Sequence, residues 1–291
     1  MTAEPANILT VDVEDYFQVS RFRNLVRPEN WGGYPLRISE SVHAALDLLE
    51  ESCTHATFFV LGWIARKRPD LVREIKTRGH EIASHGYAHR LAFEQTEEEF
   101  KEDVKTAKIL LEDLTGGRVL GYRAPTYSIL KAPFAAYDIL AEVGYRYDSS
   151  VFSPGRCRCG GEGGNYMPYP IECANGRRVL EYPLASAALF GVNMPVGRGG
   201  YLRLLPLPLI KAAVRKINLR GAPATMSFHP WELDEHQPRM PVSLKARFCH
   251  YLNIHTTKPK VRALCSSFHF GRICDTLDDY LDCESPRRDD T

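Results

Sequence analysis

The stretch ATFFVLGWIARKRPDLVREIKTRGHEIASHGYAH, residues 56–89, has the pattern of a strand, a helix and a second strand in succession. Residues 56–61 are a continuous apolar run of strand length, and residues 64–78 have helical character and stop at Gly79, a residue typical of helix ends. Residues 80–84 form the next expected strand, which leads directly to His85. Strands joined through a helix run parallel in one sheet, so this stretch predicts an α/β fold.

The same alternation continues on both sides of this unit. A capping-box pattern, Thr96 with Glu99, opens a long amphipathic helix that is expected to end at Gly116. The other expected strands are residues 7–13, 119–122, 145–148, 178–184 and 224–228, and the other expected helices are residues 39–52, 133–143 and 207–217. We therefore predict an irregular (β/α) barrel over residues 1–240. Residues 241–291 are expected to form a helical C-terminal extension that packs on the barrel and contains no further strand.

Composition restricts the class of protein. The chain has 291 residues, 44% of them apolar, and a formal net charge of +1, which fits a globular protein and excludes a disordered or coiled-coil chain. Without a basic excess, no nucleic-acid partner is expected. The N-terminus lacks the pattern of an export signal, and no uncharged apolar stretch is long enough to span a membrane. The eight cysteines include no C-x-x-C pair, so we expect a cytoplasmic protein, with peripheral attachment to the inner membrane as the alternative.

Ionisable side chains stand at the ends of five expected strands. They are Asp12 with Glu14, His85 with His89, Arg123, Asp148 and His229. Parallel strands of a barrel end at one rim, which is where active sites of such folds are built. Each residue alone is more often structural, but their joint placement predicts a catalytic site.

His85 and His89 are the expected metal ligands. Their spacing puts both imidazoles within reach of one divalent cation, with Zn²⁺ as the expected metal, if the residues between them form a helical turn. Two histidines that cap a helix are the alternative, because this spacing is common. Glu14 is assigned as the third ligand since it shares a strand face with Asp12. Asp15 remains the alternative third ligand because strand ends often bulge.

Five motifs resemble those of the polysaccharide deacetylase family, also called the NodB-homology domain or carbohydrate esterase family 4. They are TVDVED at 10–15, SHGYAH at 84–89, GYRAPTYS at 121–128, YDSSVF at 147–152 and MSFHPWE at 226–232, in the family's order. The first motif departs from the family's pattern, because extra residues separate its two carboxylates. DVEDYF and the later HYLNIHTTKPKVRALCSSFHFGRI are similar to deacetylases encoded with bacterial exopolysaccharide assembly genes.

The resemblance implies a NodB-type barrel and a role for each residue of the rim. Asp12 is the implied general base and His229 the implied general acid. Arg123 is expected to pair with Asp12 and orient it, and Asp148 to stabilise the charge of His229. The backbone N–H of Tyr127 is implied to bind the oxyanion. The aromatic residues expected to stack on sugar faces are Trp231, Tyr16 and Phe17.

The predicted function is that of a polysaccharide deacetylase. Such a hydrolase uses a metal-activated water to remove N-acetyl groups from N-acetylhexosamine units, here of a polysaccharide or a lipid-linked glycan precursor. The expected partner is therefore an acetylated glycan or glycolipid. Two other functions remain open: hydrolysis of another small amide on the same fold, as by an allantoinase or formamidase, and a catalytically silent carbohydrate-binding module.

Overall fold

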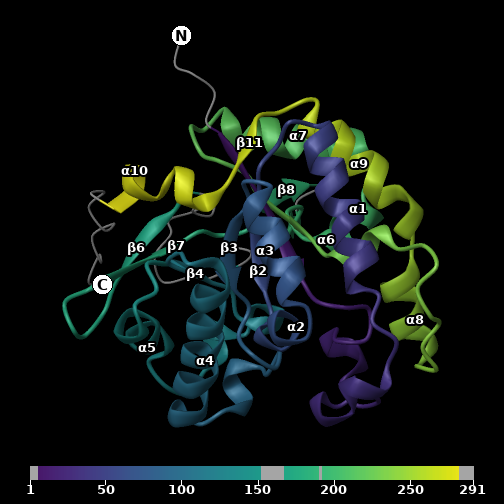
Figure 1. Cartoon of the computed structure of the whole chain (residues 1–291). Helices are drawn as coiled ribbons and strands as arrows, with labels where there is room; N and C mark the ends of the chain where they lie inside the picture. The colour runs from purple at the N-terminus through teal and green to yellow at the C-terminus, as the bar shows by residue number, and fades with distance from the viewer. Residues whose placement is uncertain (1–5, 152–166, 190–191, 282–291) are drawn as a thin grey trace.

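A curled, mostly parallel sheet forms the centre of the molecule, and helices pack along its outer side (Figure 1). The computed structural model describes residues 6–151, 167–189 and 192–281. The order of the strands is β10-β1-β2-β3-β4-β5-β7-β6, in which β6 and β7 pair antiparallel and the other neighbours pair in parallel. The strands are β1 (Asn7–Val13), β2 (Thr57–Val60), β3 (Glu81–Ser84), β4 (Gly121–Tyr122), β5 (Tyr147–Asp148), β6 (Tyr169–Glu172), β7 (Arg178–Glu181) and β10 (Thr225–Phe228). Strands β8 (Ala187–Leu189) and β9 (Val192–Met194) form a separate antiparallel pair.

The helices confirm the predicted alternation of strand and helix. They are α1 (Ile38–Glu51), α2 (Gly62–Lys67), α3 (Pro69–Thr77), α4 (Glu97–Thr115), α5 (Ala136–Val143), α6 (Gly199–Leu204), α7 (Leu207–Asn218), α8 (Leu244–Tyr251), α9 (Thr257–Cys265) and α10 (Leu277–Leu281). At the start of α4, Thr96 and Glu99 form the expected reciprocal capping box, and Gly116 ends the helix in a left-handed conformation. None of the helices in the described part of the chain has the length and apolar character that a membrane span requires.

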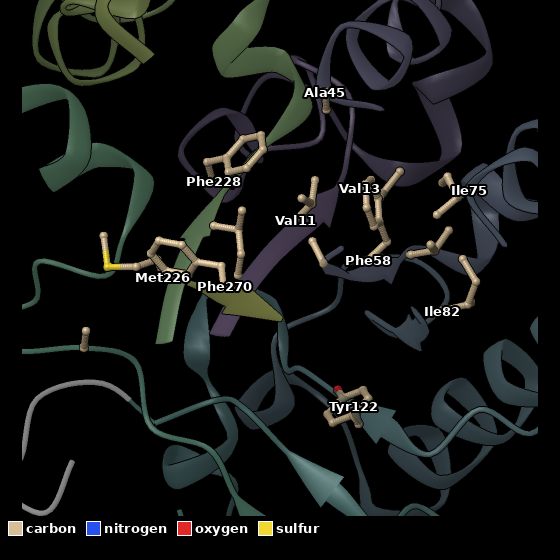
Figure 2. Packing of buried hydrophobic residues seen from close by; sticks show 14 of the residues in the cluster. Val11, Val13, Ala45, Phe58, Ile75, Ile82, Tyr122, Met226, Phe228 and Phe270 are labelled. Carbon is tan, nitrogen blue, oxygen red and sulfur yellow. The ribbon is translucent and has the colours of Figure 1, made fainter. Parts of the chain in front are cut away.

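The main core lies between the sheet and the helices (Figure 2). Val11 and Val13 of β1 pack there against Phe58 of β2 and Phe228 of β10. Side chains alternate between the two faces of a strand, so the intervening Asp12 points to the inner, concave face. The packing of two valines thus directs the carboxylate of Asp12 into the barrel.

The structure differs from the predicted elements in three respects. The single helix over residues 64–78 is two helices, α2 and α3, since Pro69 lacks an N–H and forces Arg68 out of the helical conformation (φ −134°, ψ 65°). Strands β6, β8 and β9 and helix α6 were not predicted. The extension after residue 240 is not purely helical, because β11 (Phe270–Gly271) pairs in parallel with the start of β1. A two-residue strand is too short to produce a periodicity signal in the sequence.

Candidate active site

The end of β1 supplies two carboxylates to the site and one to the scaffold. After Val13 the chain turns back, with the N–H of Glu14 donating to the carbonyl of Asp12 (3.0 Å). Asp15 is fully buried, and its carboxylate accepts hydrogen bonds from the backbone N–H groups of Tyr16, Arg37 and Ile38 (2.8–3.0 Å). Asp15 therefore holds the start of α1 and does not join the histidines.

Glu14, His85 and His89 come together as one cluster. Their ligand-type atoms all lie within 4.8 Å of one another, and Oε2 of Glu14 is 2.9 Å from Nε2 of His89. The segment between the histidines is not the helical turn that we expected. Gly86 and His89 both have positive φ (73° and 52°), and this irregular loop brings the two imidazole rings to a centroid distance of 5.3 Å.

Asp103 of α4 holds this loop in place, and the sequence did not indicate it. Its carboxylate accepts from the N–H groups of Tyr87 (2.9 Å) and Ala88 (3.4 Å). A Cβ at Gly86 would lie 2.7 Å from Oδ2 of Asp103, so close an approach requires glycine there. The loop therefore depends on a long-range contact with α4.

The donor set fits a divalent cation. Nδ1 of His85 hydrogen-bonds the carbonyl of Arg123 (2.8 Å), which fixes the ring with Nε2 free for a ligand bond. Burial lowers the pKa of His85 to about 4, so its imidazole is neutral at pH 7, the form that binds metals. Oε2 of Glu14 is buried without a hydrogen-bond partner among the described residues. Two histidines and one carboxylate match the ligand types and number of catalytic zinc sites.

Asp12 is held by Arg123, as predicted. The guanidinium of Arg123 is fully buried and donates to Oδ1 of Asp12 (2.6 Å), while Oδ2 faces Ser227 (3.4 Å) and His229 (3.8 Å). Burial alone would raise the pKa of Asp12, but the nearby Arg123, His85 and His229 lower it below its ordinary value. Asp12 is therefore a carboxylate with one oxygen fixed and the other directed at the site.

His229 follows β10 and faces three carboxylates. Its Nε2 is 3.3 Å from Oε1 of Glu14, and its Nδ1 is 3.5 Å from Oε1 of Glu232. Burial alone would lower the pKa of His229, but Glu232, Glu14 and Asp12 raise it above its ordinary value. Glu232 is itself held by Arg203, whose Nε lies 3.2 Å away. This arrangement favours the protonated imidazole.

The expected pairing of Asp148 with His229 is wrong. Asp148 accepts from the N–H (3.0 Å) and the hydroxyl (2.7 Å) of Ser150, and the register of β5 with β7 sets it opposite Glu181. Burial raises the pKa of both carboxyls. The residue that stabilises His229 is Glu232, which stands three positions later in the motif MSFHPWE and could have been found by that spacing.

The aromatic residues do not take the expected roles. The N–H of Tyr127 donates to the carbonyl of Ala124 (2.9 Å), so it is already engaged. Trp231 is 5% exposed, stacks against His229 (5.2 Å) and His250 (4.1 Å), and donates from its indole to Oε1 of Glu14 (3.4 Å). It orients a ligand and has no free face for a sugar. Tyr16 and Phe17 are buried in the apolar cluster that also contains Trp231.

A pocket of about 210 Å³ opens over these groups. It is lined by Asp12, Glu14, Val19, Ser20, Arg21, His85, His89, Ala124, Thr126, Tyr127, Arg198, His229 and Trp231. Arg21 and Arg198 were not predicted, since nothing in their local sequence distinguishes them from surface arginines. Of the residues predicted for the site, Arg123, Asp148, Tyr16 and Phe17 do not line this pocket, and the others do.

Family models match two adjacent parts of the chain. Residues 32–147 match the polysaccharide deacetylase model, and residues 149–278 match a domain of unknown function (DUF3473). His85, His89 and Arg123 fall in the first match and His229 in the second, while Asp12 and Glu14 precede both.

Known proteins are similar to this chain in parts of the sequence or in the fold. The chain is similar to a peptidoglycan-N-acetylglucosamine deacetylase of Bacillus cereus, with 34% identity over 86 residues, 30% of this chain and 31% of the relative. The chain spans less than half of the length of the first curated relatives that it matches. A putative polysaccharide deacetylase from Mycobacterium smegmatis has the same fold, with a TM-score of 0.64 and 20% identity over 97% of this chain and 94% of that one. The structure of Puue allantoinase is also similar, with a TM-score of 0.61 and 16% identity over 94% of this chain and 89% of that one.

The fold and the site define a barrel of the deacetylase type. The five motifs in the family's order and the match over residues 32–147, which is less than half of the chain, agree with the resemblance to the polysaccharide deacetylase family predicted from the sequence.

Proposed function

We propose that this protein is a metal-dependent hydrolase that removes N-acetyl groups from N-acetylhexosamine units of a polysaccharide or a lipid-linked glycan precursor. The observation that carries the proposal is the juxtaposition, in one pocket, of the carboxylate of Asp12, the imidazole of His229 and a cluster of three side chains that could hold a metal ion. Amide hydrolysis needs these three elements, because water is a poor nucleophile and an amine is a poor leaving group.

Glu14, His85 and His89 would hold the cation, for which Zn²⁺ is our first choice. The chemistry that such a cation supplies when bound is a lowered pKa of its water and polarisation of the acetyl carbonyl. Trp231 supports this set by donating to one oxygen of Glu14, which leaves the other oxygen for the cation.

Asp12 and His229 divide the proton transfers. Oδ2 of Asp12 takes the proton from the attacking water, because Oδ1 is tied to Arg123. His229 carries its proton on the pocket side at Nε2, 3.8 Å from Oδ2 of Asp12, and donates it to the departing nitrogen. Glu232 at Nδ1 keeps the imidazole charged until that step. The products are acetate and a free amino sugar.

The substitution Asp12→Asn tests the base. It keeps the size of the side chain but removes the proton acceptor, so acetate release from chito-oligosaccharides should fall to background while the metal content by elemental analysis stays near one per chain. Asp70→Asn, at an exposed carboxylate of α3, is the matched control and should retain activity. Undiminished turnover by Asp12→Asn would refute the base assignment, and wild-type protein without a stoichiometric divalent cation would refute the metal.

The alternative functions give different results in the same preparation. An allantoinase-like enzyme would open a cyclic ureide and release no acetate from acetylated glycans. A silent binding module would bind chito-oligosaccharides without turnover, and its affinity would not change in Asp12→Asn.

A further inference from the structure

Helix α8 carries two large apolar side chains on its outer side. Leu244 is 82% exposed and Phe248 is 63% exposed, although folding usually buries residues of these types. They stand four positions apart and therefore lie on the same face of the helix, which we call the apolar strip. The helix itself lies at the edge of the molecule (Figure 1). The fold thus leaves the apolar strip in contact with solvent.

The opposite side of α8 is attached firmly to the protein. Ala246 packs in the apolar cluster that contains Trp231, and the fully buried His250 stacks on the Trp231 ring at a centroid distance of 4.1 Å. Nε2 of His250 is 2.7 Å from Oε1 of Gln237. At the end of the helix, the buried Arg203 donates to the carbonyl of His250 (2.7 Å). The apolar strip is therefore part of a fixed helix.

Basic side chains flank the apolar strip. Successive residues of a helix are rotated by about 100°, which puts Lys245 and Arg247 about 80° to either side of the strip. Both side chains are exposed, and neither makes an ion pair or a side-chain hydrogen bond with a residue in the described ranges. Helix α8 therefore presents an apolar strip between two positive charges that no described residue compensates.

The sequence around α8 is basic throughout. Residues 236–274 contain seven Lys or Arg and no Asp or Glu, which gives this stretch a formal charge of +7 in a chain of +1. The nearest acidic residues along the chain are Glu235 before the stretch and Asp275 after it. The basic residues of this stretch that bond to carboxylates or carbonyls all follow α8 and are Lys260, Arg262 and Arg272. A partner of the outer face of α8 is therefore expected to be negatively charged.

An anionic lipid surface fits this combination of groups. A helix with an apolar face and basic side chains lies at the level of the lipid head groups, where its apolar residues reach the acyl chains and its charges meet anionic phosphates. A second copy of the chain fits less well. A two-fold contact through the apolar strip would bring the basic side chains of both copies together, which like-charge repulsion disfavours.

We propose that α8 docks on an anionic membrane, with the apolar strip inserted among the lipid head groups and its two flanking basic side chains bound to their phosphates. On the inner side of the helix, His250 stacks on Trp231, which lines the catalytic pocket. Docking through α8 therefore holds the pocket close to the membrane. The inference goes beyond the proposed function and does not depend on it, because membrane binding is measured without turnover.

Cosedimentation of the full chain with lipid vesicles tests the docking. Vesicles of phosphatidylcholine with about one-third phosphatidylglycerol should bind the chain at least about tenfold more strongly than vesicles of phosphatidylcholine alone, because each basic side chain near an anionic surface strengthens binding several-fold. High salt should remove most of this difference, since it screens the charges.

The double variant Leu244→Gln/Phe248→Gln tests the apolar strip. It should weaken binding to the anionic vesicles by at least about tenfold, because burial of apolar side chains drives insertion. Leu219→Gln, at a leucine that is 88% exposed just after α7, is the matched control and should bind as the wild type does.

The double variant Lys245→Gln/Arg247→Gln tests the flanking charges. It should remove most of the preference for anionic over neutral vesicles. Arg66→Gln/Arg73→Gln neutralises two exposed arginines on α2 and α3 and should keep the preference.

Several results would overturn the docking. They are equal binding of the wild type to both kinds of vesicle, no binding to either, and undiminished binding of Leu244→Gln/Phe248→Gln. Dimerisation of the wild type in sedimentation velocity, without vesicle binding and lost in the same double variant, would assign the apolar strip to a second copy of the chain instead. A failure to release acetate from glycans would refute the proposed function and leave the vesicle result unaffected.

Discussion

Replacement of Arg123 by methionine should destabilise the protein strongly. Arg123 is fully buried and donates five hydrogen bonds, to Asp12, Thr10, Ser227 and both the carbonyl and the hydroxyl of Ser149. Methionine has a similar length and can keep the contact with Phe59, over whose ring the guanidinium lies at 4.1 Å. The change therefore removes the charge and the donors while it leaves little empty space.

The expected loss of stability follows from the carboxylate of Asp12, which stays buried after Arg123 is removed. Removal of one partner from a buried ion pair costs about 3–5 kcal/mol, since the other charge stays buried without compensation. We expect the free energy of unfolding of Arg123→Met to fall by about 4 kcal/mol at pH 7. The double variant Arg123→Met/Asp12→Asn, in which the remaining carboxylate is neutral, should recover about half of this loss.

Urea unfolding of chelator-treated protein, followed by tryptophan fluorescence, measures these differences. Arg78→Met removes a partly exposed arginine with three surface ion pairs and is the control, with an expected change of at most about 1 kcal/mol. The penalty for Arg123→Met should also shrink as the pH falls, because the unpaired Asp12 then becomes protonated. A double variant no more stable than Arg123→Met would refute the view that the Asp12 charge is what Arg123 compensates.

Three further predictions concern other carboxylates and a helix cap. Glu232→Gln removes the negative charge 3.5 Å from Nδ1 of His229, so the raised pKa of His229 should fall. The alkaline limb of the pH profile of kcat/KM should then move to lower pH by about one unit. A limb that does not move would exclude Glu232 as the residue that keeps His229 protonated. Burial and the neighbouring Asp148 raise the pKa of Glu181 well above its ordinary value. The folded state therefore keeps a proton that the unfolded chain releases. The free energy of unfolding of the wild type should decline as the pH rises above the ordinary carboxyl range. Glu181→Gln imitates the protonated form and should flatten this decline in thermal unfolding between about pH 5 and pH 8. An unchanged slope would argue against a proton held on Glu181 in the folded state. Thr96→Ala removes the N-terminal cap of α4 and should lower the free energy of unfolding by about 1 kcal/mol. A loss smaller than the error of urea titration would count against a stabilising role of the capping box.

Elements with a strong local signal were predictable. Strand β1 was expected over residues 7–13 and is observed at Asn7–Val13, because a run of β-branched and apolar residues packs both against neighbouring strands and against helices. The start and end of α4 were predictable for the same reason, since the cap and the final glycine act on backbone groups a few residues away. The break at Pro69 was also local and could have been recognised from the proline.

Two of the errors at the site involve contacts between distant parts of the chain. The role of Asp148 depends on the register of β5 with β7, which sets it opposite Glu181 and away from His229. The shape of the His85–His89 loop depends on Asp103 of α4. Periodicity and spacing describe only neighbours along one element, so neither contact has a sequence signal.

The sequence by itself determined the order of the main strands and helices, the resemblance to a family and the chemical groups of the site, because these depend on residue types and on local patterns of burial. Only the tertiary structure decided that Glu14, and not Asp15, lies beside the histidines. The turn after Val13 brings Glu14 to His89. Three backbone N–H groups hold the carboxylate of Asp15 near the start of α1. The presence of Arg21 and Arg198 in the catalytic pocket was likewise a tertiary result. Directions of side chains at strand ends depend on the path of the backbone and on packing across the fold, which the linear pattern of residues does not specify.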